Sequence, residues 1–214
     1  VQYRDIVILS RSVATWGNTV AAVLKDCDIP AHVESNTGYF SSYEIQVILS
    51  MLRILDNPLQ DIPMAAVLAS PIVGMDDEEL AQIRSAFKGV SFAQAALSAM
   101  AGEDGYEDEK LKAFALVFER LRGAVADTPI HELLYMMLDE TGFYRYASAM
   151  PAGKRRRQNI DMLIEMAAAY EKTSYKGLFH FVRYIDIQQK YEIDYGCLLY
   201  TSPSPRDRQK SRMP

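Results

Sequence analysis

The sequence has little of several things on which whole classes of protein depend. It holds two cysteines, Cys27 and Cys197, and three widely separated histidines. Two cysteines are too few for a disulfide framework or a zinc site, which fits a reduced, cytoplasmic compartment. No stretch reaches the ~18 consecutive apolar residues that a membrane span needs. These absences exclude disulfide-stabilised, zinc-binding and membrane-spanning proteins.

Catalytic motifs are missing as well. A phosphate-binding loop has the pattern G-x-x-x-x-G-K-[ST], in which backbone amides surround the phosphates and Lys reaches the terminal ones. Beside the Gly153–Lys154 pair, Ser148 stands where the first glycine belongs and Arg155 where Ser or Thr belongs. Neither G-x-S-x-G nor H-E-x-x-H occurs. We therefore expect no catalytic residue, no metal site and no bound cofactor in this chain.

Helical patterning is what the sequence has most of. Residues 3–10 are a short β-rich run and Pro30 introduces another at 31–33, which predicts strand, helix, strand with a helix near 15–28. From Tyr43 onward we expect helices over 43–57, 76–87, 107–126, 128–138, 154–171 and 175–190. The carboxylates at 76–79 suit a helix start. The expected fold is mainly α, with a partial α/β segment followed by an all-α domain.

Two short segments are candidate nucleic-acid contacts. Four cations follow one another at Lys154, Arg155, Arg156 and Arg157. Adjacent helical residues point about 100° apart, so these cations spread around a helix; a solvated helix start and a nucleic-acid contact both remain open. The aromatic pair Tyr39–Phe40 lies in a turn-rich loop, where the rings either stack on bases or pack inward.

The last 18 residues differ from all that precedes them. They carry a net charge of +3, whereas the first 196 residues carry −8. An acidic body argues against a general phosphate-coating protein but leaves room for a local basic groove. Back-translated, residues 197–207 resemble a transposase-type sequencing adapter. We expect residues 197–214 to be a disordered translated artefact, and the biological sequence to end near Gly196.

Several motifs together resemble the second motor domain of superfamily 1 helicases of the UvrD/PcrA/RecB kind. That family has a strand ending in Arg and a small polar residue, then an aromatic loop, an E-I helix, an N-P stop and a P-x-x-G turn. The matching residues here are Arg11–Ser12, Tyr39–Phe40, Glu44–Ile45, Asn57–Pro58 and Pro71–Gly74. The wording TGYF, DNPLQDIP and SPIVG, with Gly153, Arg156, Asn159 and residues 170–186, is most similar to AddA-type subunits of AddAB helicase–nucleases.

The resemblance implies a part of a larger enzyme. Residues 1–57 would be the first part of the RecA-like motor domain 2A, and residues 58–196 the helical 2B insertion. The whole protein would use ATP and Mg to move along single-stranded DNA at a duplex junction, with an AddB-type partner and a nuclease domain, in double-strand break repair and recombination. The fragment alone would be inactive, because the ATP and nuclease motifs lie outside it.

The resemblance carries over residue by residue only in part. Arg11, Tyr39 and Phe40 are the best matched DNA-contact candidates. Ser41–Ser42 and Ala69 stand where relatives carry Asp-Arg and Arg, so no DNA contact carries over to them. The alternative interpretation is a stand-alone helical protein-interaction module without a motor.

Overall fold

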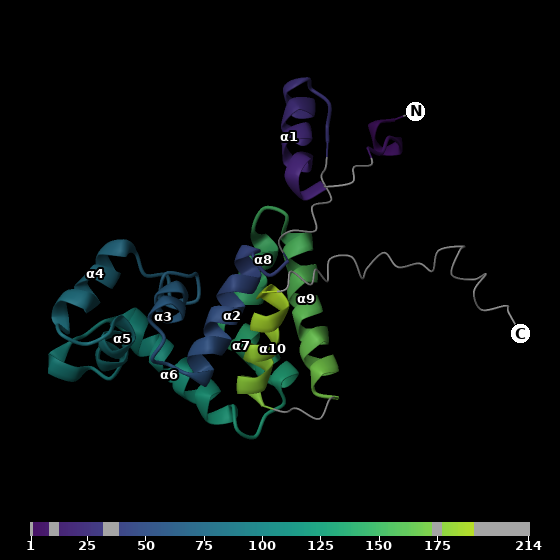
Figure 1. Ribbon diagram of the computed structural model, residues 1–214. Coiled ribbons are helices and arrows are strands. Elements are labelled where there is room, and N and C mark those ends of the chain that lie inside the picture. The colour runs from purple at the N-terminus through teal and green to yellow at the C-terminus, as the bar shows by residue number, and fades with distance from the viewer. Residues whose placement is uncertain (1, 9–12, 32–38, 173–176, 191–214) are drawn as a thin grey trace, which may run out of the picture. The chain divides into compact units, whose positions relative to one another are not determined.

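The computed structural model describes residues 2–8, 13–31, 39–172 and 177–190. Expectations that concern Arg11, most of the strand at 31–33 and the adapter-like tail lie outside the described residues. The chain divides into two compact units, residues 1–41 with 188–214, and residues 42–187 (Figure 1).

The N-terminal unit differs from the expected α/β segment. Tyr3–Asp5 forms a short 3-10 helix, η1, and α1 spans Val13–Asp26. The strand expected over residues 3–10 is wrong where the chain is described, because Ile6 to Ile8 follow η1 without pairing and Val7 is 75% exposed. A strand needs a neighbour for its backbone hydrogen bonds, and the described residues contain no other strand. The mainly α character of the chain is confirmed.

The second unit is a helical assembly. Its elements are α2 (Tyr43–Asp56), α3 (Asp61–Leu68), α4 (Asp77–Ala86), α5 (Phe92–Met100), η2 (Glu103–Gly105), α6 (Glu109–Ala124), α7 (Ile130–Thr141), α8 (Phe143–Ala149), α9 (Gly153–Tyr170) and α10 (Leu178–Lys190). The long helices begin and end within a few residues of their predicted bounds. The short helices α3, α5 and α8 were not predicted, because nine residues or fewer give little periodicity to detect.

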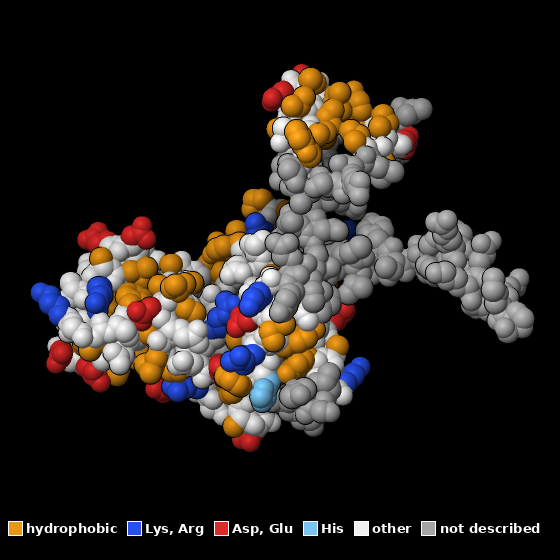
Figure 2. Space-filling model, in the orientation of Figure 1, with side chains coloured by type: hydrophobic (Ala, Val, Ile, Leu, Met, Phe, Trp, Pro, Cys, Tyr) orange, Lys and Arg blue, Asp and Glu red, His pale blue; other side chains and the backbone are white. Residues whose placement is uncertain are grey.

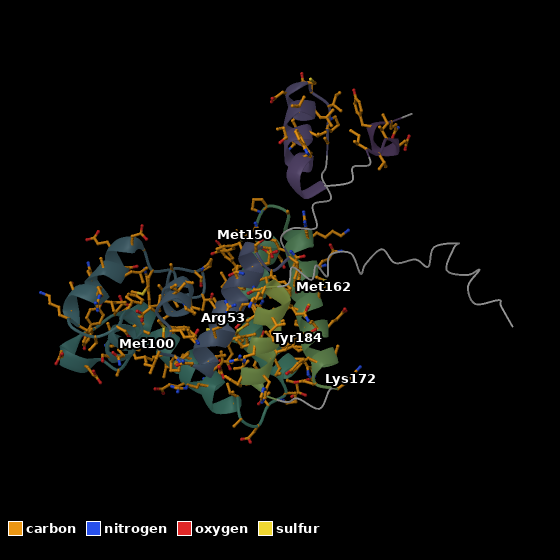
Figure 3. The ribbon with its side chains drawn as sticks, in the orientation of Figure 1. Arg53, Met100, Met150, Met162, Lys172 and Tyr184 are labelled. Atoms are coloured by element: carbon orange, nitrogen blue, oxygen red, sulfur yellow. The ribbon has the colours of Figure 1, made fainter. Side chains whose placement is uncertain are left out.

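Helix α2 forms the centre of the helical unit. Ten of its 14 residues are buried, as its nearly continuous apolar sequence predicts. It packs against α3, α6 and α9. An ion pair of 2.7 Å from Arg53 to Asp186 also joins it to α10, and Figure 3 labels Arg53 on α2. Because α2 contacts so many elements, its first turn is held firmly in place.

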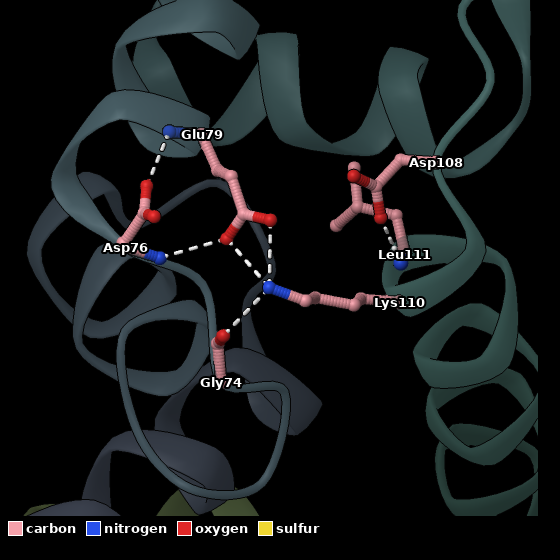
Figure 4. A network of polar contacts seen from close by, with 6 residues as sticks. All are labelled: Gly74, Asp76, Glu79, Asp108, Lys110 and Leu111. Atoms are coloured by element: carbon pink, nitrogen blue, oxygen red, sulfur yellow. Dashed lines mark hydrogen bonds and ion pairs between the residues drawn. The ribbon is translucent and has the colours of Figure 1, made fainter.

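A polar network fixes the start of α4. Asp76 accepts a hydrogen bond from the Glu79 amide, and the Glu79 carboxylate accepts one from the Asp76 amide, both at 2.8 Å. Lys110 of α6 donates to Glu79 and to the Gly74 carbonyl (Figure 4). The Lys110 hydrogen bond, assisted by the Asp76 amide, holds the pKa of Glu79 below its usual value. The capping role predicted for the acidic run at 76–79 is confirmed.

The start of α7 is held by a residue distant in sequence. Glu171 accepts a hydrogen bond from the Ile130 amide and contacts Nδ1 of His131. A side chain that caps a free amide stabilises the first turn of a helix. His131 therefore helps to hold Glu171 at the start of α7. Across the described helices, none is long and apolar enough to cross a membrane.

Candidate nucleic-acid interface

Glu44 is a buried carboxylate in the first turn of α2. Its relative exposure is 2%. A buried charge is strongly destabilising unless it is paired and hydrogen-bonded. Both of its oxygens are satisfied by α9: Oε2 accepts from Nη1 of Arg156 at 2.5 Å, and Oε1 accepts from Nδ2 of Asn159 at 2.6 Å. Glu44 therefore joins the first turn of α2 to the first turns of α9.

Arg156 is positioned by more than this carboxylate. Its Nε donates to the Pro151 carbonyl at 3.0 Å, so the guanidinium spans the turn that precedes α9. Arg156 and Asn159 are three residues apart and share one face of α9. The guanidinium thus performs a structural task between two helices, whatever contact it makes with a ligand.

The turn between α8 and α9 brings the two helix ends very close together. A Cβ on Gly153 would lie 1.9 Å from the Ser148 carbonyl oxygen, so only glycine fits there. Ala152, just before it, has the left-handed φ of 59°. The Ser148 hydroxyl donates to the Tyr144 carbonyl at 2.7 Å. This tight turn places the start of α9 beside the end of α8.

Lys154, Arg155 and Arg157 are the exposed cations of this region. Within the described part of the chain, no acidic side chain lies within 4 Å of their charged groups. The first turn of α9 contains no acidic residue. Elsewhere on the face drawn in Figure 2, basic and acidic side chains are interspersed. The start of α9 is thus a local basic site on an otherwise acidic body.

Two half-exposed tyrosines lie near each other, and one of them, Tyr43, lies near Arg156. Tyr43, the first residue of α2, is 42% exposed, and Tyr146 of α8 is 46% exposed. Burial raises the pKa of the Tyr43 hydroxyl, the nearby Tyr146 raises it further, and Arg156 lowers it. Tyr146 rests against the buried Phe143, with ring centroids 6.3 Å apart and planes at 18°.

Tyr39 and Phe40 meet edge to face, with ring centroids 4.9 Å apart and planes at 72°. Tyr39 is buried and Phe40 is half-buried. Both belong to the N-terminal unit, whereas Lys154, Arg155 and Arg157 belong to the helical unit. Arg11 lies outside the described residues. The structure therefore places the four cations at the start of α9. The aromatic pair belongs to the other compact unit.

Sequence reasoning missed the role of Glu44 and both exposed tyrosines. Glu44 lies 112 residues from Arg156 and 115 from Asn159, so no local pattern links them. The spacing of Arg156 and Asn159 on one helical face was the available signal that they share a partner. Tyr43 and Tyr146 carry no signal, because single tyrosines are common on helices that pack into a core.

The possible metal-ligating side chains of the described residues are scattered. No group of three His, Cys, Asp or Glu side chains gathers there in a way that could hold a metal ion. The exposed cations at the start of α9 suit contact with the phosphates of a polyanion.

Known proteins are similar to this chain over most of its length. The pattern of the UvrD-like helicase C-terminal domain matches residues 1–195. A protein from Anoxybacillus flavithermus, named as a subunit of an ATP-dependent helicase/nuclease, is 41% identical over 92% of this chain and 16% of its own length. Proteins of the same name from Bacillus cytotoxicus and Bacillus velezensis are 42% and 39% identical, over 87% and 92% of this chain and 15% and 16% of their own lengths.

The match confirms the resemblance read from the motifs, and its range includes Glu44, Arg156, Asn159 and the exposed cations of α9. The chain spans about 16% of the length of the curated relatives it matches. Because the matched residues cover nearly all of this sequence, the chain belongs to the UvrD-like helicase C-terminal domain family.

Proposed function

We propose that this chain is part of a subunit of an ATP-dependent DNA helicase and nuclease that acts in double-strand break repair and recombination. The observation that carries the proposal is identity of about 40% over most of the chain to proteins that are named as subunits of an ATP-dependent helicase/nuclease. The exposed cations of α9 support it, because a DNA-acting protein needs contacts to phosphate.

The domain roles follow the family resemblance. Residues 1–57 are the first part of the RecA-like domain 2A, and residues 58–196 are the helical 2B insertion. The compact units divide at Ser41, so α2 packs with the helical part although its sequence belongs with the motor part. The Glu44–Arg156 contact supports this arrangement, since it ties the end of one segment to the other.

The proposed DNA contacts are shared between the two segments. Arg11, Tyr39 and Phe40 are the DNA contacts proposed for the motor segment, although Tyr39 is buried and Phe40 half-buried. Lys154, Arg155 and Arg157 bind phosphates from the helical segment, and Arg156 holds their helix in place through Glu44. The ligand is DNA with a single-stranded region next to a duplex.

Other parts of the full protein supply the chemistry. ATP and Mg bind outside this chain, as do the nuclease carboxylates, and an AddB-type protein is the partner in the cytoplasm. Residues 197–214 are a translated sequencing adapter and have no function. An independent clone of the same genomic region tests the last point; recovery of the same 18 residues from intact genomic DNA contradicts it.

Assays on the purified chain test whether it contacts DNA while ATP hydrolysis belongs to other parts of the protein. We expect it to bind single-stranded oligonucleotides weakly, in a salt-dependent manner, and to hydrolyse no ATP with or without DNA. A coupled ATPase assay and fluorescence anisotropy with a labelled oligonucleotide measure both quantities. Measurable ATP turnover that survives repurification contradicts the domain placement.

A further inference from the structure

Helix α3 turns apolar side chains to solvent as well as to the core. Of its eight residues only Asp61 is polar. A helix that is apolar all round is normally buried on every side. Here Ile62 is 84% exposed, more than any other large apolar side chain that the structure describes. An exposed apolar patch of this kind marks a surface that another molecule covers.

The exposed residues of α3 lie on one side of the helix. Successive helical residues are about 100° apart, so Ile62, Ala66 and the C-cap Ala69 fall within about 60° of one another. All three are exposed. Leu59, three residues before Ile62 in the preceding turn, is 55% exposed. We name Leu59, Ile62, Ala66 and Ala69 the α3 face.

The α3 face lies in an acidic part of the chain. Residues 54–83 contain six Asp or Glu and no Lys, Arg or His. Figure 2 shows hydrophobic side chains gathered over α3, with acidic side chains beside them at the start of α4. Asp76 and Glu79 are used in the capping network of Figure 4, whereas Asp77 and Glu78 are exposed. The apolar face therefore has a negatively charged border.

Two cations lie beside this border, and each already has partners. Lys110 donates to Glu79. Arg84 donates to a backbone carbonyl of the loop before α5. The pKa of Asp61 is lowered by a backbone hydrogen bond from Ala93 and, less strongly, by the charge of Arg84. Since six acids outnumber these two cations, the border keeps a negative charge.

The charge of the border selects among possible occupants of the α3 face. Nucleic acid and anionic membranes are repelled by acidic side chains, and a second copy of this chain would bring two acidic borders together. An amphipathic helix with cationic flanks satisfies both features, because its apolar side covers Leu59 and Ile62 while its cations meet Asp77 and Glu78. The small side chains on the rest of the face let such a helix approach closely.

We propose that the α3 face docks an amphipathic helix of another protein chain, with large apolar side chains along one side and Lys or Arg along its flanks. Apolar residues of that helix at i, i+3 or i+4, and i+7 match the two turns from Ile62 to Ala69, about 10 Å along the axis of α3. The inference goes beyond the proposed function, because it assigns a protein-binding surface and no DNA contact.

Fluorescence anisotropy with a labelled model peptide tests the proposal on the full 214-residue chain. The probe is a helix of about 18 residues with leucine on one side and lysine on the other. The variant L59S/I62S is expected to bind it about 10-fold more weakly or worse, because it removes the large apolar side chains of the face. D77N/E78Q should weaken binding about 3-fold at low salt and less at high salt.

Matched controls keep the same chemistry at other places. L116S/I187S replaces a leucine and an isoleucine that are 68% and 50% exposed, on α6 and α10. E119Q/E165Q neutralises two exposed acids on α6 and α9. Neither control should change peptide binding beyond about 2-fold. Far-UV circular dichroism checks that all variants are folded.

Two control peptides separate docking from general attraction of cations to an acidic protein. One has glutamate in place of lysine, and the other is a scrambled sequence of the same composition. A wild-type chain that binds the lysine peptide no better than either control peptide overturns the proposal. Equal binding by L59S/I62S and L116S/I187S also overturns it. Neither result changes the proposed function, which the oligonucleotide and ATPase assays test separately.

Other occupants give different results. Sedimentation velocity shows whether the wild-type chain dimerises; a dimer that dissociates in L59S/I62S but persists in L116S/I187S assigns the face to a second copy and overturns the proposal. Peptide binding must also persist in a longer native polypeptide that contains this segment. Its loss there places the occupant within the same polypeptide and overturns docking of another chain.

Methyl NMR locates the peptide without any variant. The chain is labelled at its isoleucine and alanine methyl groups and titrated with the lysine peptide. The largest shift changes are expected at Ile62, Ala66 and Ala69. Shift changes confined to other methyl groups overturn the proposal.

Discussion

At the scale of single residues, the buried carboxylate of Glu44 leads to the clearest prediction about stability. The two members of the Glu44–Arg156 ion pair differ in exposure, since the Glu44 side chain is 2% exposed and the Arg156 side chain is 24% exposed. Removing Arg156 leaves a charge stranded in the interior, whereas removing Glu44 leaves a guanidinium that can reach water. The two partners are therefore expected to be unequal in their effect on stability.

We expect Arg156→Met to lower the free energy of unfolding by about 3 kcal/mol and Glu44→Gln by only about 1 kcal/mol, because glutamine keeps one carbonyl oxygen as an acceptor and the Arg156 guanidinium can reach water. Urea unfolding followed by circular dichroism measures both. The matched control is Asp186→Asn in the half-exposed Arg53–Asp186 pair, which should cost less than about 1 kcal/mol. Equal losses in all three variants would contradict a buried, fully satisfied Glu44.

Substitutions at Ala152 and Gly153, just before and at the start of α9, should change stability in opposite directions. Gly153→Ala places a Cβ against the Ser148 carbonyl oxygen and is expected to cost about 1 to 3 kcal/mol. Ala152→Gly relieves a left-handed backbone conformation and should stabilise by about 0.5 kcal/mol after the entropy of the unfolded chain is counted. Thermal unfolding of the pair decides the matter; a harmless Gly153→Ala refutes the close approach of α8 and α9.

Asp61 gives a pH dependence of defined sign. Its Oδ1 accepts from the Ala93 amide at 2.9 Å, and this backbone hydrogen bond is the main reason that its pKa lies below the usual value for aspartate, although burial opposes it. A lowered folded-state pKa means that Asp61 contributes stability above its unfolded pKa and loses it as the pH falls toward the folded value. Asp61→Asn should therefore reduce the acid-induced fall in unfolding temperature between about pH 5 and about pH 2.5. An unchanged acid profile would contradict the contact.

At the scale of helices, α9 begins with charges of the sign that its own dipole disfavours. The amide end of a helix is partially positive, and four cations stand there without an acidic residue. We expect K154Q/R155Q/R157Q to raise the unfolding temperature by roughly 2 °C at low salt and by less at high salt. The same variant should weaken DNA binding. A fall in unfolding temperature would mean that these cations stabilise the fold, and would weaken their assignment to a ligand.

The helices also show how much of the structure can be predicted from the sequence. Helices α2, α6, α7 and α9 are predictable because twelve or more residues repeat an apolar face, and the Asp76–Glu79 start is predictable from its capping chemistry. The strand expected at residues 3–10 fails because strand formation depends on a partner that local sequence does not specify. The site behaves in the same way, since its cations form one visible run but their anchor Glu44 and the two tyrosines come from other helices.

At the scale of the whole molecule, a helical unit with one local basic site fits a component of a larger machine. The chain belongs to a helicase family and spans about 16% of its relatives. Its own residues hold helices together and present cations and rings, while the proposed ATP and nuclease chemistry lies elsewhere. The central claim is therefore that this sequence is one segment of a continuous helicase–nuclease polypeptide.

The coding DNA on either side of residues 1–196 in the source genome tests that claim most directly. The account predicts one open reading frame with a phosphate-binding loop upstream, a T-x-H-x-x-K-G-L-E stretch downstream, and family sequence in place of residues 197–214. Stop codons that close the frame on both sides of this segment would contradict it.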